Sequence, residues 1–262
     1  ERLERWGKHT VVRPDPVALW DRVKPQLWEN PDAVYHRSSA GGGEWEYKKN
    51  LPESWIIRYG ELSFKVSPTG FKHMGLFPEQ GVNWDLIAAL LAGRDAHILN
   101  LFAYTGAATV AAARAGAKVT HVDASKGVLS WANENLRLSR VPAGQVRFIH
   151  DDSKKFIQRE VRRKSRYNGI IMDPPSFGRG AKGEVWKLED DLWDLLKDAA
   201  ELMDSNPVFF LVNSYSAGLS PLVVANMLSC LKLRFRTITC GELLIPFGER
   251  FLPSGTSCWG EF

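Results

Sequence analysis

The sequence predicts an α/β fold, a doubly wound seven-stranded Rossmann-like sheet preceded by a small N-terminal β-rich module. From about residue 80 onward, short apolar runs alternate with amphipathic runs, and acidic residues stand where three of the short runs end. Alternating strands and helices favour a parallel sheet, which binds ligands at the carboxyl ends of its strands. We therefore expect two domains, residues 1–70 and residues 71–262.

Residues 1–70 are predicted to form antiparallel hairpins with one short helix at residues 17–23. The alternation of Leu62, Phe64 and Val66 is typical of a half-buried strand. The expected strands span residues 33–37, 44–48, 55–59 and 62–66. Five of the 10 tryptophans lie in this module, and we interpret them as packing groups, with stacking on bases as the alternative.

The second domain is predicted to alternate between strands and helices and to close with two consecutive strands. Apolar spacing near 3.6 residues marks its helices, and short runs rich in β-branched residues mark its strands. The expected helices span residues 82–91, 107–115, 126–138, 154–164, 190–203 and 222–231. The expected strands span residues 97–102, 118–123, 146–150, 168–172, 208–213, 235–244 and 256–262.

The composition excludes several classes of protein. No apolar run reaches the length of a membrane span, and 44% hydrophobic residues are enough for a full core. Cys230, Cys240 and Cys258 are odd in number and lack C-x-x-C spacing, which argues against disulfides and zinc and favours the cytoplasm. The net charge of +4 is compatible with nucleic acid binding but does not establish it.

The turn after the first predicted strand of the sheet runs from Asn100 to Gly106. A nicotinamide site requires G-x-G-x-x-G at this point, but the turn holds only one glycine, and Tyr104 would obstruct a diphosphate. The cofactor is therefore expected to lack phosphates. Asp123 ends the next strand, where a carboxylate can accept both ribose hydroxyls. Asp151 and Asp152 follow the third strand, where a carboxylate can accept from an adenine amine; helix capping is the alternative for each acid.

The fourth strand ends on Asp173, Pro174 and Pro175, followed by Ser176 and Phe177. Prolines lack a backbone N–H and restrict the preceding residue, so the strand stops abruptly with unused carbonyl acceptors. A carboxylate, these carbonyls and an aromatic ring can hold a flat nitrogenous group. The alternative is a rigid strand-to-loop turn without function.

In these motifs the chain resembles class I S-adenosylmethionine-dependent methyltransferases, over Phe71 to Phe262. It is most similar to bacterial enzymes that methylate 23S ribosomal RNA, of the cytosine C5 or guanine N7 type, whose N-x-F-x-Y-T-G, V-D-x-S, D-D and D-P-P-x-F motifs it matches. Residues 75–80 resemble their G-x-F-L-D-Q motif. The resemblance implies S-adenosylmethionine as cofactor, bound by Phe77, Gln80, Asn100, Phe102, Tyr104, Thr105, Gly106, Asp123, Ser125, Asp151, Asp152 and Asp173.

The methyl acceptor is expected to be a nitrogen. Cytosine C5 requires a cysteine nucleophile, and Ser176 and the Ser214–Gly218 stretch contain none. Asp173 and the Pro174 carbonyl can accept from an amine while Phe177 stacks on the base, so these three are the expected catalytic residues. In the related amino-methyltransferase motif the aromatic follows the prolines directly, whereas Ser176 intervenes here. The expected substrate-binding residues are Pro175, Phe177, Arg179, Lys182 and Tyr215.

These observations predict an enzyme that methylates an RNA base nitrogen, with guanine in ribosomal RNA as the favoured target and with neither membrane nor metal as partner. A methyltransferase of proteins or small molecules, or a donor-binding domain without catalysis, are the alternatives. The basic stretch 154–166 is interpreted as a solvated helix face, with phosphate binding as the alternative. His73 is a candidate base, although a lone histidine is more often structural.

Overall fold

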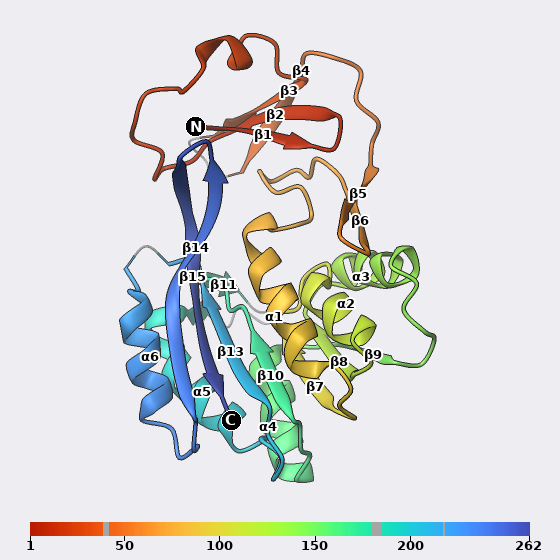
Figure 1. Cartoon of the computed structure of the whole chain (residues 1–262), viewed down its shortest axis with the longest axis vertical. Helices are drawn as coiled ribbons and strands as arrows, with labels where there is room; N and C mark the ends of the chain where they lie inside the picture. The colour runs from red at the N-terminus through yellow and green to blue at the C-terminus, as the bar shows by residue number, and fades with distance from the viewer. Residues whose placement is uncertain (39–41, 180–184, 217) are drawn as a thin grey trace. The chain divides into compact units, whose positions relative to one another are not determined.

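The computed structural model describes residues 1–38, 42–179, 185–216 and 218–262. The chain divides into two compact units, which Figure 1 shows with the chain coloured from red to blue. The first unit contains Glu1–Pro78 and Pro246–Leu252, and the second contains Glu79–Ile245 and Pro253–Phe262. The first unit is therefore built from two separate stretches of the chain.

The first unit contains two small sheets and a short 3-10 helix, η1 (Pro25–Trp28). One sheet has the order β1 (Arg2–Trp6), β2 (His9–Arg13), β3 (Ala33–Arg37), β4 (Gly43–Tyr47), and the other pairs β5 (Trp55–Tyr59) with β6 (Leu62–Val66). The last four strands were predicted. The first hairpin was missed, although Gly7 and Lys8 form a two-residue turn between its strands. The antiparallel prediction is wrong for β2 and β3, which pair in parallel because a long connection lets the chain return.

The predicted helix at residues 17–23 is wrong, since this stretch is irregular. Val17, Leu19, Trp20 and Val23 are all exposed, so a helix here would have no buried face to stabilise it. Of the five tryptophans, Trp6 is buried, while the Trp20 ring stacks on Phe247, with ring centroids 5.7 Å apart.

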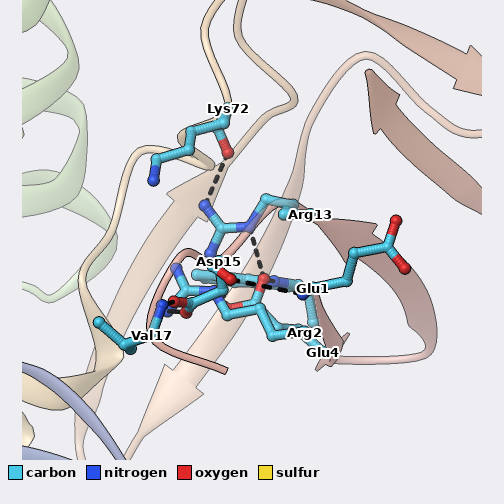
Figure 2. A network of polar contacts seen from close by, with 8 residues as sticks. Glu1, Arg2, Glu4, Arg13, Asp15, Val17 and Lys72 are labelled. Atoms are coloured by element: carbon cyan, nitrogen blue, oxygen red, sulfur yellow. Dashed lines mark hydrogen bonds and ion pairs between the residues drawn. The ribbon is translucent and has the colours of Figure 1, made fainter. Parts of the chain in front are cut away.

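A buried ion pair lies in the first sheet, between Arg13 and Glu4 (Figure 2). Arg13 is 2% exposed and donates through Nε (2.6 Å) and Nη2 (2.7 Å) to the two carboxylate oxygens of Glu4. Its Nη1 donates to the Lys72 carbonyl at 2.6 Å. Burial by itself would raise the pKa of Glu4, but the charge and hydrogen bonds of Arg13 hold this pKa below its usual value.

The second unit is built on a seven-stranded sheet of order β14-β15-β13-β10-β7-β8-β9. Five of its strands run parallel, and β15 is antiparallel to β13. The strands are β7 (His97–Leu101), β8 (Lys118–Asp123), β9 (Val146–His150), β10 (Gly169–Met172), β13 (Phe209–Ser214), β14 (Thr237–Phe247) and β15 (Arg250–Glu261). The predicted doubly wound, seven-stranded sheet is confirmed.

Helices cover both faces of this sheet (Figure 1). One face carries α1 (Gly81–Leu91), α2 (Ala107–Arg114) and α3 (Lys126–Leu138), and the other carries α4 (Ser153–Arg163) and α5 (Leu188–Ala200). Apolar side chains of α4, α5 and α6 (Pro221–Ser229) join those of the central strands in one buried cluster. Besides β1, β2 and η1, the elements that were not predicted are η2 (Pro78–Gln80), β11 (Phe177–Arg179) and β12 (Val185–Lys187).

Candidate active site

The carboxyl ends of the parallel strands bring most of the predicted site residues to one edge of the sheet. Asp123 ends β8, Asp151 follows β9, Asp173 follows β10, and Tyr215 follows β13. The turn from Asn100 to Gly106 joins β7 to α2 at the same edge. Strands of a parallel sheet all end at one edge, so this arrangement follows from the topology.

The turn after β7 is strained. Phe102, Tyr104 and Gly106 have φ values of 53°, 49° and 83°, in the left-handed region. Only glycine adopts this region without cost, and such strain gathers at functional sites. A Cβ on Gly106 would lie 3.0 Å from the Ala132 Cβ. Glycine is therefore needed there for both its conformation and its lack of a side chain.

Two carboxylate oxygens and one amide hold this turn in place. Asp123 accepts from the Tyr104 N–H through Oδ2 and from the Ser125 N–H through Oδ1, both at 2.9 Å. The Asn135 side chain, on α3, donates to the Thr105 carbonyl at 2.9 Å. Each oxygen of Asp123 keeps lone-pair capacity for a ligand hydroxyl. Asn135 was not predicted, because nothing in the local sequence distinguishes it from other helix asparagines.

Asn100 lies beneath the turn rather than on its surface. It is 2% exposed and donates to the Thr109 Oγ1 at 2.9 Å, and this oxygen lies 2.9 Å from the His121 Nδ1. Burial lowers the pKa of His121 to about 3, so the ring is neutral at physiological pH. Asn100 therefore supports the turn from below, and its contact with the cofactor stays a prediction.

The two acids after β9 have structural partners. Asp152 caps α4 by accepting from the Lys155 N–H at 2.9 Å. Asp151 accepts from the Asp152 N–H at 2.9 Å and forms an ion pair with Arg159. The capping alternative thus holds for Asp152, and its contact with adenine stays a prediction.

The carboxyl group of Asp173 has a strongly raised pKa. Burial, and secondly the negative charge of Glu79, raises its pKa to about 7. Its side chain is half-buried, and its own N–H donates weakly to the Leu101 carbonyl at 3.4 Å. Two adjacent carboxyl groups are not both ionised at neutral pH without cost. A carboxyl that exchanges its proton near pH 7 at a ligand-binding edge is a functional candidate.

The chain beyond Asp173 forms a small aromatic ribbon. Pro174 is buried, Pro175 is exposed, and Phe177 is 54% exposed at the start of β11, which pairs with β12. Trp186, on β12, donates through Nε1 to the Pro175 carbonyl at 2.6 Å, and its ring centroid lies 5.7 Å from that of Phe102. Trp186 was not predicted. Arg179 ends β11, and Lys182 lies outside the described residues.

A predicted cofactor residue and a predicted substrate residue contact each other. The Gln80 Nε2 donates to the Tyr215 hydroxyl oxygen at 2.8 Å. Phe77 belongs to the first unit, where its ring centroid lies 5.2 Å from that of His73. Burial, and then the charges of Arg13 and Lys72, lower the pKa of His73 to about 4.

The basic helix α4 packs through the buried Phe156 and Ile157. Lys154 pairs with Asp191, Arg159 with Asp151, and Arg163 with Glu160. These contacts support its interpretation as a packed surface helix. Within the described ranges, no group of three or more His, Cys, Asp or Glu could hold a metal ion, and no helix is long and apolar enough to cross a membrane.

Comparison with known proteins decides between the classes that this edge allows. Residues 32–221 match the family model described as S-adenosylmethionine-dependent methyltransferase. The chain belongs to this family. The fold of the chain, and the methyltransferase activity and S-adenosylmethionine donor that the family's description names, agree with the sequence predictions.

Solved structures and curated relatives add detail. A SAM-dependent methyltransferase from Agrobacterium tumefaciens is 38% identical, with a TM-score of 0.92 over 99% of this chain and 86% of that one. The methyltransferase SMU.776, solved with SAH, shares the fold at 20% identity and a TM-score of 0.74, over 89% of this chain and 62% of that one.

Two curated relatives are both named ribosomal RNA large subunit methyltransferase K/L. The one from Syntrophotalea carbinolica is 32% identical over 68% of this chain, and the one from Shewanella frigidimarina is 37% identical over 55%. The chain spans only 25% and 19% of their lengths.

Proposed function

We propose that this chain transfers a methyl group from S-adenosylmethionine to a nitrogen of an RNA base, and that the base is guanine in ribosomal RNA. The observation that carries the proposal is Asp173, a carboxyl with a pKa of about 7 at the edge where the donor family binds its ligands. The names of the K/L relatives support ribosomal RNA as the substrate. We expect the enzyme to act in the cytoplasm.

The residues present suit this donor. Asp123, Asp173 and Glu79 make the edge acidic, which favours a cofactor that carries a positive charge and disfavours one that carries phosphates. When bound, S-adenosylmethionine supplies a methyl group on a cationic sulfur. We assign its ribose to Asp123, whose two oxygens are oriented by backbone amides, and its adenine to Asp152.

We assign proton transfer to Asp173 and stacking on the base to Phe177. Ionised Asp173 accepts a hydrogen bond from the N–H of the attacking nitrogen and takes the proton as the methyl group is transferred. With a pKa of about 7, the same group returns that proton to water without a large barrier. Phe177, 54% exposed, is available to stack on the base.

The positions of the cysteines favour nitrogen over cytosine C5. Cys258 lies on β15 opposite Val212, and burial raises the pKa of its thiol to about 12. Cys230 ends α6, and Cys240 lies on β14. None of the three stands after β10 or β13, where a nucleophile for C6 would be needed.

The test is transfer of radiolabelled methyl groups into ribosomal RNA from cells that lack the gene. The wild-type protein is expected to label one nucleotide, which nuclease mapping identifies, and Asp173→Ala to lower the rate by about 10²–10⁴-fold. Asp194→Ala removes an exposed carboxylate on α5 and is expected to retain activity within about twofold. Micromolar donor binding without RNA label would contradict the proposal and turn attention to protein or small-molecule acceptors.

A further inference from the structure

A chain of buried, hydrogen-bonded side chains links Tyr215 to two other parts of the second unit. Trp259 on β15 contacts Asn83 on α1, Asn83 contacts Gln80 at the end of η2, and Gln80 contacts Tyr215 after β13. Trp259, Asn83 and Gln80 are 5%, 3% and 7% exposed. Polar groups that are buried this deeply and fully hydrogen-bonded hold their geometry firmly.

The indole N–H of Trp259 fixes which atom donates and which accepts in each hydrogen bond of this series. An indole N–H can only donate, so the Asn83 atom 2.9 Å away must be its carbonyl Oδ1. Ser257 donates to the same oxygen at 3.1 Å. The Asn83 amide nitrogen therefore faces the other way and donates to the Gln80 Oε1 at 2.6 Å.

The same reasoning fixes the donor and the acceptor of the hydrogen bond between Gln80 and Tyr215. Because the Gln80 carbonyl faces Asn83, its amide nitrogen must face the Tyr215 hydroxyl, 2.8 Å away. An amide N–H can only donate, so the hydroxyl oxygen accepts, and its single hydrogen points away from Gln80. The Asn83 amide also donates to the Asn213 Oδ1 at 3.1 Å, so both of its hydrogens are used and it has no reason to flip.

The ring of Tyr215 is held as firmly as its hydroxyl. A Cβ on Gly255 would lie 2.7 Å from the Tyr215 Cε1, so the ring packs in space that only glycine leaves open. Met172 and Val212 are register partners, so Asp173 and Asn213 follow side by side, and Tyr215 stands two residues further along. The oriented hydroxyl thus belongs to the edge that carries Asp173.

We propose that Tyr215 donates its hydroxyl hydrogen to a carbonyl oxygen of the methyl-accepting base and so selects bases with a carbonyl over bases with an amine at that position. The inference rests on the proposed function for the identity of the acceptor. Guanine presents O6 as an acceptor, whereas adenine presents an amino group there. A site with a fixed donor rejects the amine, because two donors then face each other.

Two variants test the proposal through activity. Tyr215→Phe removes the hydroxyl, and Gln80→Glu turns the donor beside it into an acceptor that draws the hydroxyl hydrogen inward. Both are expected to lower kcat/KM for ribosomal RNA about tenfold, and the double variant no further. Gln80→Met, which adds no charge, is expected to lose less. The Kd for S-adenosylmethionine should stay within about twofold in Tyr215→Phe, and Gln26→Glu, on an exposed residue, controls for added charge.

A base analogue tests the selectivity directly. In a synthetic RNA fragment with the mapped target, 2,6-diaminopurine replaces the guanine carbonyl by an amine. The substitution is expected to cost the wild-type enzyme about tenfold in kcat/KM and Tyr215→Phe less than about threefold. Equal losses in both enzymes, or an activity of Tyr215→Phe within twofold of wild type on ribosomal RNA, would overturn the proposal.

A measurement without RNA keeps the two proposals distinguishable. The Raman doublet of tyrosine reports whether a phenol hydroxyl accepts or donates, and subtracting the spectrum of Tyr215→Phe isolates Tyr215. The acceptor character of Tyr215 is expected in the wild type and lost in Gln80→Glu; identical difference spectra would overturn the proposal. Wild-type protein that labels no RNA would overturn the proposed function, while the Raman result still decides the direction of the hydroxyl.

Discussion

Glu4 in the first unit and Asp173 in the second are both partly buried carboxyl groups, yet their pKa values move in opposite directions. Arg13 grips both oxygens of Glu4 and holds its pKa below the usual value, whereas the charge of Glu79 adds to burial and raises the pKa of Asp173 to about 7. Burial penalises the ionised form of both, so the neighbour decides the outcome. A paired carboxylate stabilises the fold, and one beside a like charge is poised to exchange protons.

The largest effect on stability is expected from breaking the ion pair between Glu4 and Arg13. Glu4→Gln leaves the Arg13 guanidinium, 2% exposed, without its anion and should destabilise the first unit by about 3–5 kcal/mol. Calorimetry measures the loss, and Glu61→Gln, on an exposed residue, is the matched control. A loss below about 1 kcal/mol would show that the pair contributes little beyond its own desolvation.

At Asp173 we expect removal of the carboxyl charge to stabilise the protein rather than to destabilise it. Its folded pKa of about 7 lies above the ordinary aspartate value of 3.8, so the folded state binds the extra proton between these values. Stability is therefore lost as the pH rises through this window. Asp173→Asn should match wild type near pH 4 and exceed it at pH 8 by up to about 4 kcal/mol, measured by denaturant unfolding. Asp194→Asn should show no such gain, and a wild-type advantage at pH 8 would contradict the assignment.

Strands and helices with a periodic sequence pattern could be predicted from the sequence, and elements without such a pattern were missed. The strand-helix alternation placed the parallel strands, and acids at their ends pointed to Asp123 and Asp173. Trp186, Asn83 and Trp259 carried no signal, because their partners come from elsewhere in the chain and no local pattern encodes such pairing. The helix expected at residues 17–23 failed for the related reason that its apolar side chains have nothing to cover.

The smallest effect is expected from removing the negative charge of Glu79 while Asp173 is kept. Glu79→Gln should lower the pKa of Asp173 by about one unit, since one of its two causes is lost. If ionised Asp173 accepts the proton, activity rises with pH through about 7 in wild type and at a lower pH in the variant. The pH profile of kcat for RNA methylation measures this, and an unmoved acidic limb would show that Glu79 does not control Asp173.

The hairpin of β14 and β15 has a consequence for the order in which the protein matures. Its tip, Pro246–Leu252, belongs to the first unit, where Phe247 stacks on Trp20. A ribosome makes Trp20 long before Phe247, so the first unit is completed only after residues Glu79–Ile245 of the second unit have been translated. Expressing residues 1–78 alone would leave Trp20 without this partner, and deleting them would leave Phe247 without its own.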